Sequence, residues 1–100
     1  MRIDKLLWFL RLAKTRGLAQ ALVGEGHIRL NGRRVERAAQ AVAAGDVLVL
    51  PRPRGVLVIE ILQLPERRGP ASEAQACYRT LDEGSANPIA AEQIHSFSRT

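Results

Sequence analysis

The apolar residues of this chain change their spacing near Gly26, and that change limits the fold more than any other feature. Downstream, Ile28 and Leu30 alternate with polar residues up to Asn31-Gly32, the strongest short signal for a two-residue hairpin turn. Upstream, the apolar positions have the spacing of one helix face: Ile3, Leu6, Leu7, Leu10 and Ala13. Helices followed by antiparallel strands predict an α+β fold.

Two helices are expected before the first strand. The spacing predicts one over about 2–12 and a short one over 18–23, with Thr15 or Gly17 as its cap. The core face of the second helix is expected to consist of Leu18, Leu22 and Ala19. Trp8 projects from the side of the first helix that is opposite the core.

Short strands are expected to follow. The first turns back at Gly32, and Ala44-Gly45-Asp46 indicates another turn before a strand over 47–50. Pro51 and Pro53 predict a loop over 51–55, because proline cannot donate to a ladder, and a long apolar strand follows over 56–64. We therefore expect two short helices packed on a small, mainly antiparallel sheet, in a domain over residues 1–66.

A separate C-terminal extension is expected after Gly69-Pro70. Ser72-Glu73-Ala74-Gln75 has the spacing of a capping box and predicts a helix from Glu73 to about Leu81, within an extension over 67–82. The apolar side of that helix is expected to cover Trp8; the alternative is that Trp8 stacks on a base. Gly, Ser, Ala, Asn and Pro dominate residues 83–100 and predict a flexible tail.

Positive charge is concentrated at the start of the chain. The formal net charge is +5, and nine of the fifteen Lys and Arg residues fall within the first 37 positions, against three acidic residues. From Gly69 onward, acidic residues outnumber basic ones. Such a field favours polyanionic partners, meaning nucleic acid or an anionic membrane surface.

Enzymatic and metal sites leave no trace in the sequence. The two histidines, His27 and His95, form no known metal spacing with Cys77, and the carboxylates are scattered. We expect no catalytic residue, no metal and no cofactor. No apolar run approaches the roughly 20 residues of a membrane span, so we expect a cytoplasmic protein without a membrane partner.

The order of these motifs resembles a known family. Arg2-Ile3-Asp4-Lys5, Lys14-Thr15-Arg16 and the segment 26–32 follow the pattern of the RNA-binding domain of ribosomal small-subunit protein four, also called the αL motif. The resemblance covers about residues 1–50. Within that family the chain is most similar to small bacterial ribosome-associated heat-shock proteins, through Trp8 and the segment 67–74. The tail here is short and acidic on balance, and Leu6 stands where the family pattern has an aromatic residue.

The resemblance implies a non-catalytic protein that binds structured RNA, with ribosomal RNA of the large subunit as the expected partner in a heat-shock or stalled-ribosome recycling role. DNA binding, and a stress-adaptor or protein-interaction role for the extension, are alternatives. The oligomeric state is left open. The residues that the resemblance and the charge pattern mark for RNA contact are Arg2, Lys5, Lys14, Thr15, Arg16, Gln20, Arg29, Asn31, Arg33 and Arg34.

Overall fold

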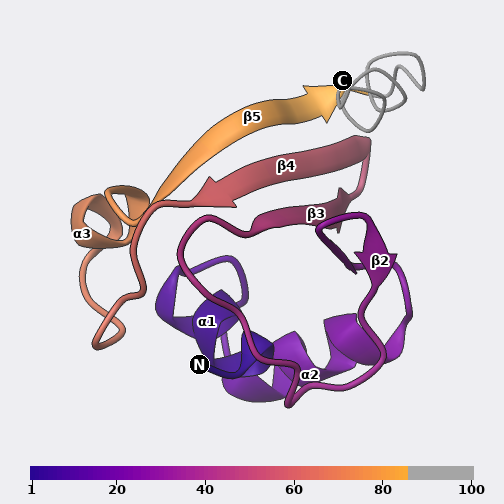
Figure 1. Cartoon of the computed structure of the whole chain (residues 1–100), viewed down its shortest axis with the longest axis horizontal. Helices are drawn as coiled ribbons and strands as arrows, with labels where there is room; N and C mark the ends of the chain where they lie inside the picture. The colour runs from indigo at the N-terminus through magenta and orange to yellow at the C-terminus, as the bar shows by residue number, and fades with distance from the viewer. Residues whose placement is uncertain (86–100) are drawn as a thin grey trace.

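The computed structural model describes residues 1–85. Helices α1 and α2 come first, four strands follow, and a short helix precedes the last strand (Figure 1). The elements are α1 (Ile3–Phe9), α2 (Arg16–Gly24), β1 (Arg29–Leu30), β2 (Arg33–Arg34), β3 (Val47–Arg52), β4 (Gly55–Ile61), α3 (Ala71–Gln75) and β5 (Tyr78–Ser85). None of the described helices is long and apolar enough to cross a membrane.

The strands form one sheet in the order β2-β1-β3-β4-β5, and every neighbouring pair is antiparallel. Helices α1 and α2 lie against one side of it (Figure 1). This arrangement confirms the predicted α+β fold. Inward-facing residues of both layers fill one core: Ile3, Leu6, Leu7, Leu10, Ala19, Val23, Ile28, Val35, Leu48, Leu50, Leu57, Ile59 and Ile61.

Helix α1 is shorter than expected, because the chain turns at Arg11. Arg11 has a φ of 62°, in the left-handed region that non-glycine residues avoid. The N–H of Leu12 donates to the carbonyl of Leu7, and that of Arg11 donates to the carbonyl of Trp8, the two bonds of a Schellman motif. An arginine therefore occupies the position that glycine usually takes.

Of the two predicted caps of α2, Thr15 is the one that forms, with its side chain accepting a hydrogen bond of 3.0 Å from the N–H of Leu18. The expected core face was partly wrong. Ala19 and Val23 are buried and Leu22 is partly buried against the core, whereas Leu18 is 51% exposed.

The hairpin forms at Asn31-Gly32, where both residues have positive φ, 51° and 85°. The Asn31 side chain also holds the hairpin to β3, because its Oδ1 accepts from the N–H of Val47 at 2.9 Å and its Nδ2 donates to Asp46 at 3.1 Å. The turn at Ala44-Gly45 is present as well, with a Gly45 φ of 94°.

Pro51 lies in β3, not in the expected loop, and pairs in register with Val56. Both backbone groups of Val47 face Asn31, on the side of β1, and alternate residues of a strand face the same way. The ring nitrogen of Pro51 thus points away from β4, past the end of β1, where no ladder bond is lost. Strand β4 ends at Ile61, earlier than expected.

The helix expected over 73–81 is wrong in extent. Helix α3 begins at Ala71 with Pro70 at the capping position, so no capping box forms, and the chain becomes strand β5 at Tyr78. Strand β5 covers the edge of β4, which would otherwise expose unpaired backbone groups. Of the segment expected as a flexible tail, residues 86–100 lie outside the described residues.

Candidate nucleic-acid interface

Asp4 is the centre of the candidate interface. Its side chain is completely buried and accepts hydrogen bonds from both helices. Gln20 Nε2 donates to Oδ2 at 3.0 Å, Arg16 Nε at 3.4 Å, and Arg2 donates to both carboxylate oxygens at 3.1 Å. The N–H of Lys5 completes the set at 2.7 Å. One carboxylate therefore fixes three of the predicted RNA-contact side chains on one surface.

The charge of Asp4 is stabilised by these donors. Burial by itself raises the pKa of a carboxyl group, but the hydrogen bonds from Gln20, Arg2 and Lys5 and the positive charge of Arg16 outweigh it. The pKa of Asp4 is consequently lowered from its ordinary value. The guanidinium groups of Arg2 and Arg16 remain half exposed while they hold this carboxylate.

The N-terminus of α2, not that of α1, is open to an anion. The first amides of α1, those of Ile3 and Asp4, donate to the carbonyls of Gln40 and Ala38 in the loop that follows β2. The first turn of α2 lies beside the exposed Lys14 and, among residues 1–85, receives only the Thr15 cap. Free backbone N–H groups and the positive end of the helix dipole favour phosphate at such a turn.

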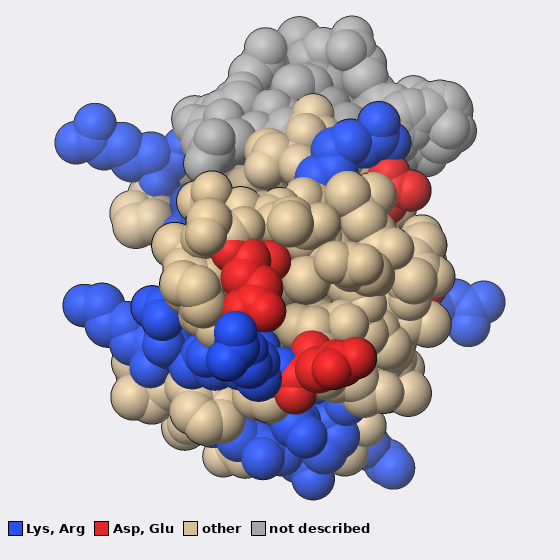
Figure 2. Space-filling view, turned by 90° about the vertical axis from the view of Figure 1, so that its left-hand side faces the viewer, with Lys and Arg blue, Asp and Glu red and all other residues tan. Residues whose placement is uncertain are grey.

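Three arginines lie on the hairpin. Arg29 and Arg34 are cross-strand neighbours, and the Arg34 side chain lies over Gly26. Arg33 is the cross-strand neighbour of Leu30, so it points to the other face of the hairpin. All three are exposed. Figure 2 shows Lys and Arg side chains gathered over the lower half of one face, with acidic side chains just above them.

The residues predicted to contact RNA lie in several different places in the structure. Arg2, Arg16 and Gln20 meet at Asp4, Lys14 and Thr15 lead into α2, and Lys5 Nζ lies 5.2 Å from the centre of the Phe9 ring. Asn31 is tied to Asp46 and Val47 in the fold. That these residues contact RNA remains a prediction.

Two features of the surface were not predicted. Asp4 was grouped with the scattered carboxylates, although its place between Arg2 and Lys5, on the helix side facing away from the core, could have indicated an ion pair. Arg68 lies beside Trp8, with its guanidinium carbon 6.0 Å from the centre of the ring. No spacing in the sequence connects two residues that far apart.

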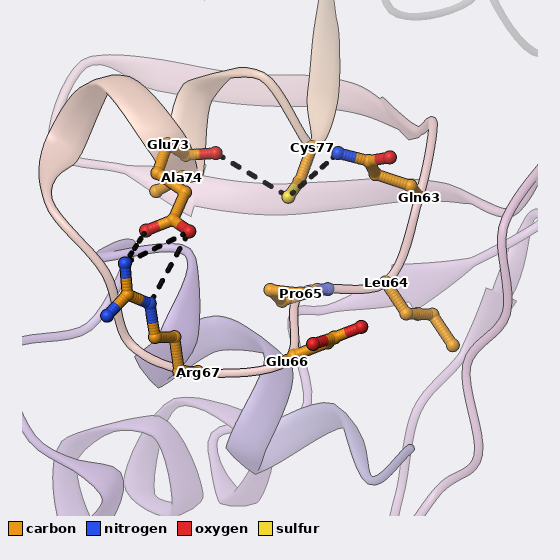
Figure 3. Close-up of a pocket in the computed structure, with 8 residues that line it drawn as sticks. All are labelled: Gln63, Leu64, Pro65, Glu66, Arg67, Glu73, Ala74 and Cys77. Carbon is orange, nitrogen blue, oxygen red and sulfur yellow. Dashed lines mark hydrogen bonds and ion pairs between the residues drawn. The ribbon is translucent and has the colours of Figure 1, made fainter.

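A pocket of about 220 Å³ lies in the C-terminal extension, between the segment after β4 and α3 (Figure 3). The Cys77 thiol donates to the carbonyl of Glu73 at 3.6 Å and accepts from Gln63 at 3.8 Å. Arg67 and Glu73, which also line the pocket, form an ion pair of 3.2 Å. Within the described residues, no group of three His, Cys, Asp or Glu could hold a metal ion.

Comparison with known proteins agrees with this geometry. The family model described as "S4 domain" matches residues 1–48, which include the hairpin and the Asp4 cluster, meaning Asp4 with its donors Arg2, Lys5, Arg16 and Gln20. The solved structure of trimeric heat shock protein 15 from Vibrio cholerae has a TM-score of 0.77 and 30% identity, and the match covers 100% of this chain and 96% of that chain. The chain belongs to the heat shock protein 15 family of S4-domain proteins.

Curated relatives extend the comparison. The heat shock protein 15 homologue of Haemophilus influenzae is 34% identical over 82 residues, which are 82% of this chain and 62% of that protein. Small ribosomal subunit protein uS4 of Opitutus terrae is 47% identical over 45 residues, or 45% of this chain and 22% of that protein. The chain thus spans about three fifths of the length of the heat shock protein 15 relatives it matches.

Proposed function

We propose that this chain is a non-catalytic protein that binds structured RNA through α1, α2 and the β1–β2 hairpin. The Asp4 cluster carries this proposal, because it holds two guanidinium groups and an amide in fixed positions inside the part of the chain that matches the S4 domain. Pre-ordered side chains lose less conformational freedom when a ligand binds. Their remaining donors suit phosphate oxygens.

Structured RNA fits this surface better than a single strand. Double-stranded RNA is recognised mainly by shape and through phosphate and 2′-hydroxyl groups, whereas proteins that bind single strands rely on aromatic side chains on which bases stack. The chain has four aromatic Phe, Trp and Tyr residues, and Phe9, beside the Asp4 cluster, is buried. Arginines and a helix N-terminus are the groups that this surface offers.

A charge-removal experiment tests the proposal. Lys14→Ala with Arg33→Ala removes two exposed cations whose side chains make no hydrogen bond or ion pair within residues 1–81. The control, Arg52→Ala with Arg54→Ala, removes the same charge from the β3–β4 turn. The probe is a fluorescein-labelled RNA stem-loop, compared with a DNA duplex of the same sequence and with oligouridine.

The first variant should bind the stem-loop more weakly. Its salt slope, the slope of the logarithm of the binding constant against the logarithm of the salt concentration, should be less steep by about 1.4–1.8, since each lost phosphate contact contributes about 0.7–0.9 to it. The control variant should lose much less. Equal losses in both variants would show that binding follows net charge alone. Tighter binding to the DNA duplex would assign the surface to DNA.

We further propose that the RNA is ribosomal RNA of the large subunit, in a heat-shock or stalled-ribosome recycling role. The membership in the heat shock protein 15 family and the similarity to a ribosomal protein support this proposal. Purified large and small subunits, sedimented separately with the protein, provide the test. Cosedimentation with the large subunit that is lost in Lys14→Ala with Arg33→Ala is the expected result, and cosedimentation with the small subunit alone would contradict it.

A further inference from the structure

The segment between β4 and α3 packs against the turn that leads into α2. Arg11 Nε donates a hydrogen bond of 2.7 Å to the carbonyl of Gly69, and Arg68 Nη2 donates to the carbonyl of Lys14 at 3.5 Å. The guanidinium of Arg68 also lies over the ring of Trp8. Residues 68–69 thus lie next to the turn that the proposed function uses, although they are outside the matched S4 domain.

Adjacent arginines in this segment have different surroundings. Arg67 forms its ion pair with Glu73, whose side chain lies close over the buried Gly69. Arg68 has no ion pair with any residue of 1–81. The charge of Arg67 is neutralised, whereas that of Arg68 is not.

The donors of Arg68 are largely unused. A guanidinium has five N–H donors. In Arg68, Nε is buried without a hydrogen-bond partner in the described part of the chain, and the bond from Nη2 to Lys14 is at the long limit. A partly buried cation with one long hydrogen bond and a buried, unpaired Nε is costly, so such a group needs an explanation. The cation–π contact with Trp8 positions the guanidinium and leaves its Nη groups able to bind an anion.

We propose that Arg68 is an RNA-contact residue, which binds a phosphate next to the one at the α2 N-terminus and extends the contact surface beyond the S4 domain. This inference rests on the proposed function. Trp8 and Arg11 act as positioning residues, the first by its cation–π contact with the guanidinium and the second by fixing Gly69. The C-terminal extension is then part of the RNA-binding surface.

Arg68→Ala and Arg67→Ala form a matched pair, since each removes one positive charge and the two positions are adjacent. Affinity for the fluorescein-labelled RNA stem-loop is measured across a salt titration, at a temperature well below the unfolding midpoint of each variant. Arg68→Ala should weaken binding by roughly tenfold and flatten the salt slope by about 0.7–0.9. Arg67→Ala should change binding by less than about twofold, because Glu73 already neutralises Arg67.

Arg68→Lys separates contact from positioning. It retains the charge, so it should keep the salt slope of the wild type even though it loses the planar guanidinium that lies beside Trp8. Equal effects of Arg68→Ala and Arg67→Ala, or weaker binding by Arg68→Ala with an unchanged salt slope, would overturn the contact role.

The two proposals can fail separately. Wild-type protein that does not bind the stem-loop would overturn both. Wild-type binding that is lost in Lys14→Ala with Arg33→Ala but retained in Arg68→Ala would overturn only the inference about Arg68.

Discussion

Gln20 Nε2 donates a hydrogen bond of 3.0 Å to Oδ2 of Asp4 and thereby ties α2 to the first turn of α1. The carboxylate that receives it is fully buried, while Arg2 and Arg16, its other side-chain donors, reach the surface. One buried carboxylate therefore determines where two surface charges stand. The stability of the helix pair and the geometry of the surface depend on the same residue.

Asp4→Asn should destabilise the protein by about 1–3 kcal/mol, because the neutral amide cannot accept from all of these donors and brings an N–H₂ group against them. Urea unfolding at neutral pH measures this change. Glu36→Gln is a suitable control, since it makes the same chemical change at an exposed residue. Equal stability of Asp4→Asn and the wild type would show that Asp4 is not the centre of the cluster.

The pH dependence of stability follows from the lowered pKa of Asp4. A carboxyl group whose pKa is lower in the folded state contributes stability above its unfolded pKa, here an ordinary value of 3.8, and this contribution is lost as the pH falls through the folded-state pKa. The stability difference between the wild type and Asp4→Asn should therefore be largest near neutral pH and shrink in the acid range below the ordinary value. Parallel stability curves over the whole range would contradict the ionised state of Asp4.

The β1–β2 turn gives a test of backbone strain. Gly32 and Gly24 are both exposed, and a methyl group at either would meet no atom within 4 Å, but only Gly32 has a positive φ, 85°. Gly32→Ala should cost about 1 kcal/mol, whereas Gly24→Ala, at the end of α2, should be neutral or slightly stabilising. Thermal unfolding of both variants measures the difference. Equal midpoints would show that the turn has another conformation.

The sequence predicted the hairpin turn and the helix cap, because each depends on residues that are close together in the chain. Asn31-Gly32 specifies a turn by itself, and the Thr15 side chain caps the amide three residues ahead of it, so the turn and one of the two predicted caps were confirmed without knowledge of the rest of the chain. Strand β5 was missed because the spacing of Ala74, Cys77 and Leu81 suits a helix, while the open edge of β4, which decides the outcome, is a tertiary feature.

The candidate site was predictable in its location but not in its organisation. Charge density placed it in the first 37 residues, where Lys14 and Arg16 lie. The burial of Asp4 depends on how α1 and α2 pack, and the place of Arg68 depends on a contact with Lys14 that spans 54 positions. Long-range contacts of this kind leave no periodic pattern in the sequence.

Trp8 reports directly on the contact with Arg68. Of the apolar side chains expected to cover it, Cys77 belongs to the core, and the ring of Trp8 lies near Arg68 and Phe9, at 6.0 and 5.6 Å. Arg68→Ala should red-shift the emission of this single tryptophan and increase its quenching by acrylamide, while Arg67→Ala should change neither. Identical quenching in the two variants would show that Arg68 does not cover the ring.

Arg11 combines an unfavourable backbone conformation with a favourable contact, and two substitutions separate them. Arg11→Ala keeps the φ of 62° but loses the hydrogen bond to Gly69, so we expect a loss of about 1–2 kcal/mol. Arg11→Gly loses the same bond but relieves the strain, and it should be more stable than Arg11→Ala by about 1 kcal/mol. Thermal unfolding of the two variants gives the strain as their difference. If Arg11→Gly is the less stable of the two, the flexibility that glycine adds to the unfolded chain exceeds the backbone strain at Arg11, and the expected order of the two variants is wrong.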